Sequence, residues 1–175
     1  YSSLDFDKDI YSSNDIKQDL INTNFNMGAA YIKLMENNTM RFVDDEEIVK
    51  DYLDGIKISF GNCIKLQEDM YGEKSLQVAN EYIKIAKVIF YSLGSIYMTL
   101  DNEQVIDYFA YFEKCLLNSF EIKREILGID NQETKDICYE LYQYYMANSI
   151  DVMMFKDFIK DKKKALYYGE LYMGE

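Results

Sequence analysis

The stretch from residue 58 to residue 86, ISFGNCIKLQEDMYGEKSLQVANEYIKIA, reads as the end of one helix, a turn at Gly72 and the start of a second helix. Apolar residues recur at helical spacing on both sides of the glycine. A glycine directly after such a run is typical of a helix C-cap, because glycine takes the left-handed conformation at little cost. Ser75 stands three residues later, where an N-cap is expected. The stretch therefore predicts a helix, a glycine turn and a helix.

The same pattern returns after 56 residues, the interval from Gly72 to Gly128, and Asn131 then takes the place of Ser75. With this shift, Asn62, Leu66, Met70, Tyr71, Gly72, Ile85 and Ile89 fall on Asn118, Ile122, Ile126, Leu127, Gly128, Leu141 and Tyr145. Apolar residues thus meet apolar residues, and glycine meets glycine. Self-similarity at a fixed interval indicates a protein built from stacked repeats.

The chain of 175 residues is long enough for one domain with a hydrophobic core, and it contains no proline to interrupt long helices. Segments that alternate like strands are not found, so the fold class is predicted to be all-α. We expect about six helices in three antiparallel pairs, stacked as a right-handed solenoid. Residues 1–13 are expected to form a flexible leader and residues 14–175 the domain, with units at about 16–71, 72–127 and 128–175.

Apolar stripes and capping residues place the individual helices. Ser13 or Asn14 should cap the first helix, and the run from Asn37 to Val43 breaks its period. Its apolar stripe consists of Ile16, Leu20, Met27, Tyr31 and Leu34, with Ile21, Phe25 and Ile32 beside it. Asp44 with Glu47, and Asp130 with Glu133, have capping-box spacing at the start of the second and fifth helices. The stripes expected in the later helices are Val49, Tyr52, Ile56, Phe60, Cys63 and Met70; Ala79, Tyr82, Ala86, Ile89, Leu93, Ile96 and Leu100; Val105, Tyr108, Phe112, Cys115, Ile122 and Ile126; Ile137, Cys138, Leu141 and Tyr145; and Ala165, Leu166, Tyr168 and Tyr172.

The chain is strongly acidic, with 31 Asp and Glu against 19 Lys and Arg and a formal charge of −12. A field of this sign repels phosphate backbones and anionic membrane surfaces, so nucleic acid is not expected as a partner. A basic protein surface is a plausible partner. The alternative is that the acidic residues only keep the chain soluble, and the sequence leaves both interpretations open.

The residues that most often carry catalysis are missing or isolated. The chain has no His, and Cys63, Cys115 and Cys138 are widely spaced, which indicates buried free thiols in a reducing compartment. The acidic run 44–47 lacks the ligand spacing of a calcium loop. We therefore expect no enzyme activity, no cofactor and no metal. No apolar run is long enough to span a membrane, so we expect an intracellular, cytoplasmic protein without membrane insertion.

Several of these positions resemble the tetratricopeptide repeat, in which a Leu-Gly or Leu-Ala pair and a Tyr in one helix are followed by Phe and Ala in the next. The matching residues are Met27, Gly28 and Tyr31 followed by Ile56, Phe60 and Cys63; Ile85, Ala86 and Ile89 followed by Phe112 and Cys115; and Leu141, Tyr142 and Tyr145. The string CIKLQEDMYG, residues 63–72, is similar to the variant found in kinesin light chains. A fainter likeness links ALYYGE, residues 165–170, to the helical C-terminal region of SET-MYND methyltransferases.

The tetratricopeptide resemblance implies that ligands are held by the first helix of each unit on a concave face. The implied contact residues are Asn22, Phe25, Asn26, Ala29 and Lys33; Asn80, Ile83, Lys84 and Lys87; and Tyr139 and Gln143. Asn26, Lys84 and Lys87 come near the carboxylate clamp of the family. A floor of Phe25, Ile83 and Tyr139 with scattered lysines predicts an amphipathic or acidic-hydrophobic peptide as the ligand.

The sequence therefore predicts a non-enzymatic interaction scaffold that binds a protein or peptide in a groove and belongs to a larger complex. Two alternatives stay open. One is the accessory C-terminal helical domain of a larger enzyme, such as a SET-MYND-type methyltransferase. The other is a structural helical subunit of an assembly, without a peptide groove.

Overall fold

A computed structural model describes residues 13–39, 46–96, 100, 102–149 and 162–174. Within these residues the chain forms six α-helices and no strand. The helices are α1 (Ser13–Thr39), α2 (Glu46–Tyr71), α3 (Leu76–Ile96), α4 (Asn102–Leu127), α5 (Gln132–Ser149) and α6 (Lys162–Met173). The all-α class is therefore confirmed. The expected start of the second helix at Asp44 and the expected leader up to residue 12 lie outside the described residues.

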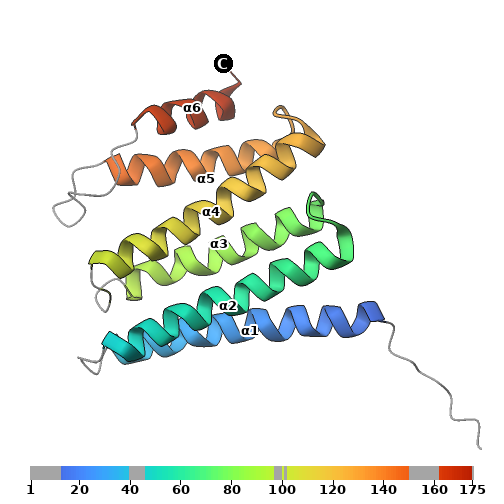
Figure 1. Ribbon diagram of the computed structural model, residues 1–175. Coiled ribbons are helices and arrows are strands. Elements are labelled where there is room, and N and C mark those ends of the chain that lie inside the picture. The colour runs from blue at the N-terminus through green and yellow to red at the C-terminus, as the bar shows by residue number, and fades with distance from the viewer. Residues whose placement is uncertain (1–12, 40–45, 97–99, 101, 150–161, 175) are drawn as a thin grey trace, which may run out of the picture.

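The helices lie side by side in the order of the chain, from α1 at one end of the stack to α6 at the other (Figure 1). They form three antiparallel hairpins, because α1 packs most extensively on α2, α3 on α4 and α5 on α6. The first hairpin contacts the second through both α1 and α2, which pack against α3, whereas α5 of the third hairpin packs on α4. A stack of hairpins joined in this order is the arrangement of an all-α helical repeat.

The two glycine turns have the same geometry, as the 56-residue interval predicts. Gly72 and Gly128 have φ angles of 86° and 84°, and each donates its N–H to the carbonyl four residues earlier. Ser75 Oγ accepts the N–H of Val78 at 3.3 Å, and Asn131 Oδ1 accepts that of Glu133 at 2.9 Å. Both predicted N-caps are thus confirmed. The capping box at Asp130 is wrong, since the Asn131 side chain occupies the cap position there.

Two buried polar contacts also repeat at this interval. Cys63 Sγ in α2 donates to the carbonyl of Ile21 in α1 at 3.3 Å, and Ser119 Oγ in α4 donates to the carbonyl of Ala79 in α3 at 2.8 Å. The two donors are 56 residues apart and the two acceptors 58, so the first and second hairpins are each held together by a small side chain at the same position of their second helix. A satisfied donor costs little when buried, which allows the backbones to approach closely.

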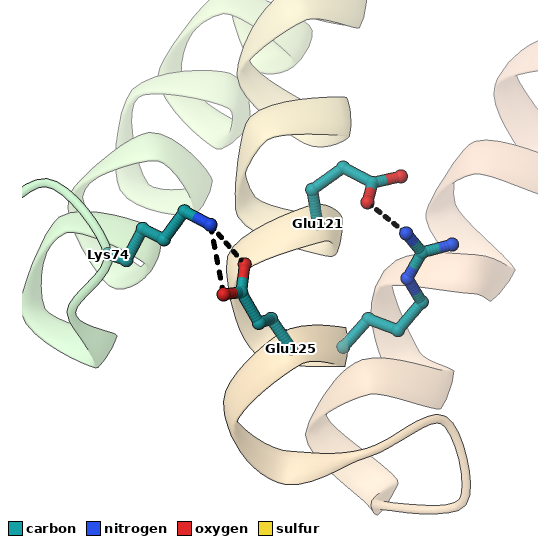
Figure 2. A network of polar contacts seen from close by, with 4 residues as sticks. Lys74, Glu121 and Glu125 are labelled. Atoms are coloured by element: carbon teal, nitrogen blue, oxygen red, sulfur yellow. Dashed lines mark hydrogen bonds and ion pairs between the residues drawn. The ribbon is translucent and has the colours of Figure 1, made fainter.

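Exposed ion pairs lie where the turn before α3 meets the C-terminal end of α4. Lys74, in the turn before α3, contacts both carboxylate oxygens of Glu125 in α4 at 2.7 and 2.9 Å (Figure 2). Arg124 in the same turn of α4 pairs with Glu121. These side chains are about half exposed, and such pairs typically contribute about 0–1 kcal/mol to stability. The stack is therefore stabilised mainly by its apolar core.

That core runs the length of the stack and contains most of the expected stripe residues of α2 to α5. Its largest fully buried side chains include Phe60, Ile85, Tyr108, Phe120 and Tyr145. Burial of apolar area of this kind is the main favourable term in folding. The expectation is wrong for Ile126, Leu166 and Tyr172, which are exposed.

The apolar stripe expected for the first helix is wrong at four of its five positions, whereas Tyr31 and the neighbouring Ile21, Phe25 and Ile32 do pack in or against the core. Ile16, Leu20, Met27 and Leu34 are exposed, and α1 instead packs on α2 with the face of Ile21, Phe25, Gly28, Ile32 and Met35. Helix α1 carries apolar residues on two faces, and at the end of the stack only one face is covered by α2 and α3. The helix turns Gly28 inward because its lack of a side chain lets α2 approach.

Candidate functional site

A groove of about 330 Å³ lies between α3 and α5, with α4 below it. The residues that line it are Ile83, Ala86, Lys87, Phe90 and Tyr91 of α3, Phe112, Leu116 and Lys123 of α4, and Glu133, Asp136, Ile137 and Glu140 of α5. Helical spacing explains the set, because positions three, four and seven residues apart share one face of a helix. The groove is thus formed by facing stripes of α3 and α5 over the buried surface of α4.

The floor and one rim of the groove are aromatic. Phe112 is buried in α4, and the ring of Phe90 stacks on it with 5.8 Å between centroids. Phe90 is nevertheless 53% exposed, and its neighbour Tyr91 is 80% exposed. Large exposed aromatic side chains are enriched in protein interfaces, because they bring contact area at little cost in rotamer entropy. This rim can therefore cover an apolar side chain of a ligand.

Charged side chains of both signs border the apolar floor. Lys123 is buried beside it and pairs with Glu133 at 2.7 Å. Lys87 lies on the α3 side, and Asp136 and Glu140 lie on the α5 side. The Lys123–Glu133 pair joins α4 to α5 beside the groove. The α5 wall as a whole carries three carboxylates.

Two of the expected contact residues, Ile83 and Lys87, line this groove. Tyr139 and Gln143 do not. The ring of Tyr139 lies 5.0 Å from that of Tyr172 in α6, and Gln143 donates a hydrogen bond to the Tyr139 hydroxyl. A step of one residue turns a helix by about 100°, so α5 presents Asp136 and Glu140 to the groove and Tyr139 to α6.

The remaining expected residues belong to the interface of α1 with α3 or to the surface near it. Phe25 packs on Phe60 at 5.5 Å, and Lys84 Nζ lies 3.7 Å from the centroid of the Phe25 ring. Lys84 also pairs with Glu81, so it is not arranged as a free clamp with Asn26 and Lys87. Asn22, Asn26, Lys33 and Asn80 are exposed and Ala29 is half buried, and these residues do not line the groove.

The sequence interpretation missed the aromatic rim and the acidic wall. A signal was present, because Glu133, Asp136 and Glu140 repeat at spacings of three and four and so share one face of α5. Phe90 and Tyr91 extend the face of Ile83 and Lys87 by one turn of α3. The contact residues implied by the repeat resemblance include the groove-lining face of α3. On α5, however, the implied Tyr139 lies one residue before Glu140, which lines the groove.

The cysteines lie away from the groove and are free and buried. Burial raises the thiol pKa values of Cys63 and Cys115 to about 12 and that of Cys138 to about 11. Such thiols stay protonated and do not act as nucleophiles near neutral pH. Within the described ranges no three His, Cys, Asp or Glu side chains are grouped so that they could hold a metal ion.

We compared the chain with protein-family models, curated proteins and solved structures, and none of the three comparisons found a match. The tetratricopeptide and SET-MYND resemblances therefore stay predictions that rest on the residues alone. None of the helices in the described part of the chain has the length and apolar character needed to cross a membrane.

Proposed function

We propose that this protein is a non-enzymatic interaction scaffold that binds a peptide or a partner helix in the groove between α3 and α5. The observation that carries the proposal is the combination of an apolar floor with an exposed aromatic rim at Phe90 and Tyr91. Apolar grooves between helices are common docking sites for amphipathic segments. Exposed aromatic residues beside a concave surface are expected to supply much of the binding energy.

The charges beside the groove favour a ligand that is apolar and basic. Asp136 and Glu140 border the floor together with Glu133, which Lys123 neutralises, and Lys87 stands on the opposite side. The chain as a whole has a formal charge of −12, which attracts basic segments from a distance. We therefore expect Lys or Arg in the ligand near α5, the reverse of the acidic-hydrophobic peptide that the lysines alone predict.

A displayed peptide library tests the proposal and does not require the natural partner to be identified first. Random peptides on phage are selected on the protein, and enriched sequences are synthesised with a fluorescent label for anisotropy titration. We expect enriched peptides to combine an aromatic or branched aliphatic residue with Lys or Arg. Phe90→Ala with Tyr91→Ala should weaken binding by about 10-fold or more, since both side chains are contact residues.

A charge reversal with a matched control separates the groove from general electrostatic attraction. Glu140→Lys should weaken binding of basic peptides by about 10-fold. Asp51→Lys in α2 makes the same change of charge at an exposed position outside the groove and should leave affinity within about 2-fold. Equal loss in both variants, or no enrichment of any peptide over the Phe90→Ala/Tyr91→Ala protein, would contradict the proposal.

The two alternatives from the sequence stay predictions. A structural subunit without a groove is disfavoured by the groove of about 330 Å³. An accessory domain of a SET-MYND-type enzyme is compatible with an all-α stack, but no contact among the described residues favours it.

A further inference from the structure

Helix α1 exposes a continuous apolar seam at the end of the stack. The residues of this α1 seam are Ile16, Leu20, Thr23, Met27, Ala30 and Leu34. They follow one another at intervals of four, three, four, three and four residues, and all are exposed. The four large side chains are between 44% and 52% exposed. Spacing of this kind is the heptad pattern of helices that pair along their length.

The seam is suited to a helix rather than to an isolated side chain. From residue 16 to residue 34 it extends over roughly 27 Å of helix. Ile16, Asp19, Leu20 and Thr23 surround a shallow hollow of about 300 Å³. Four residues spaced in this way form the hole that receives one side chain of a facing helix. Thr23 donates its hydroxyl to the carbonyl of Asp19 at 2.8 Å, so covering it leaves no polar group unsatisfied.

We propose that two copies of this chain associate through the α1 seam, with their two α1 helices antiparallel about a two-fold axis. We place the two-fold axis midway between Thr23 and Met27. Ile16 then faces Leu34 of the second copy, Leu20 faces Ala30, and Thr23 faces Met27. All six seam positions then face a seam position of the second copy, because the spacings of four, three, four, three and four residues are the same from both ends. A two-fold interface requires a surface that is complementary to itself, and the α1 seam has this property.

The charges that flank the seam agree with the antiparallel register. Asp19, Asn26 and Lys33 lie along one edge at intervals of seven. Antiparallel pairing places Asp19 opposite Lys33 of the second copy and, by symmetry, Lys33 opposite Asp19. Parallel pairing would instead place Asp19 near Asn24 and would give no opposite charges. Flanking charges of this kind set the orientation of paired helices.

The electrostatic cost of association at this end of the stack is small. Helix α1 carries three acidic residues and two lysines, a net charge of −1 within a chain of −12. Lys33 pairs with Glu36 of its own helix at 2.6 Å, but its side chain is 75% exposed. An exposed pair is worth little, so Lys33 can exchange Glu36 for Asp19 of the second copy at little cost.

Sedimentation equilibrium of the 175-residue chain tests the proposal. We expect the mass to rise with concentration from 20.7 kDa towards twice that value. Leu20→Glu with Met27→Glu should abolish this rise, and the thermal melting measured by circular dichroism should be retained because both positions are exposed. The matched control is Ile58→Glu in α2, which is 64% exposed and should dimerise like the unmodified protein.

A charge exchange tests the register. Asp19→Lys and Lys33→Asp should each weaken dimerisation by about 10-fold, since each creates two like-charge contacts. The double variant restores opposite charges and should return the dimerisation constant to within about 3-fold of the original.

Three results would overturn the proposal. These are a mass of 20.7 kDa up to about 1 mM chain, a dimer that survives Leu20→Glu/Met27→Glu or is lost with Ile58→Glu, and a double charge variant that is not restored.

Discussion

The ring of Phe60 in α2 packs directly on Gly28 in α1. A Cβ atom built on Gly28 would lie 2.5 Å from Cε1 of that ring, closer than two carbon atoms can approach. The Phe60 side chain is fully buried. A Cβ on Gly55 of α2 would likewise lie 2.7 Å from the Tyr31 ring of α1, so these two glycines let α1 and α2 approach closely on this face. The α1 seam is left outside.

Gly28→Ala should therefore destabilise the protein even though alanine favours helix formation. Overpacking of a buried contact costs typically about 1–3 kcal/mol, and the gain in helix propensity returns up to about 1 kcal/mol. We expect a net loss of up to about 2 kcal/mol in the free energy of unfolding, measured by urea denaturation.

Gly61→Ala in α2 is the matched control, because a Cβ at that position has no atom within 4 Å. It gains helix propensity without a clash and should raise the free energy of unfolding by about 0.5–1 kcal/mol. The same effect from both substitutions would show that Gly28 is not a packing position.

Glu113 connects three helices, so its removal should loosen the end of the stack. It accepts a hydrogen bond from the buried Tyr145 hydroxyl of α5 at 2.5 Å and pairs with Lys164 of α6 at 3.2 Å. Glu113→Ala leaves the Tyr145 hydroxyl without this partner, and we expect a loss of about 1–3 kcal/mol in urea denaturation.

Tyr145→Phe removes the donor of the same hydrogen bond. The double variant with Glu113→Ala should lose less free energy of unfolding than the sum of the two single variants, because it has no buried hydroxyl left without a hydrogen-bond partner. Simple additivity of the two changes would show that the hydrogen bond contributes nothing.

Stability should fall at alkaline pH, because folding opposes the ionisation of buried thiols and phenols. Burial raises the thiol pKa of Cys63 from 9.0 to about 12 and that of Cys138 to about 11, and burial raises the pKa of Tyr168 from 10.0 to about 12. The unfolded chain therefore releases protons that the folded chain keeps. The stabilisation is fully present below about pH 9 and decreases as the pH rises towards 11 or 12.

The measurement is the urea midpoint at a series of pH values from about 7 to about 11. As a companion, iodoacetamide should modify the three thiols slowly in the folded protein and rapidly in urea. A urea midpoint that does not change over this pH range would show that these groups ionise at the same pH in the folded and the unfolded chain.

Local sequence signals predicted the helices and their ends well. The left-handed turns at Gly72 and Gly128 and the N-caps at Ser75 and Asn131 appear where the sequence places them. These features depend on φ preferences and on hydrogen bonds within a few residues, so the local sequence is sufficient to identify them.

The candidate groove was only half predictable. Ile83 and Lys87 were expected, but Phe90 and the acidic wall at Glu133, Asp136 and Glu140 were not. A groove depends on how far two helices stand apart and how each is rotated, and a rotation of one residue exchanges Glu140 for Tyr139. Periodicity identifies a face to within about one residue, which is too coarse for this purpose.

The sequence by itself determined that this protein is a stack of helices with glycine-capped turns. Helix caps and helix propensity depend on residues close in the sequence, and the repeat at an interval of 56 residues can be read directly from it. Only the tertiary structure decided which apolar face each helix buries. Helix α1 carries two such faces, and the buried one is where Gly28 packs on Phe60 and Tyr31 packs on Gly55, while the other is exposed. That choice depends on the shape of a partner helix, which no local pattern contains.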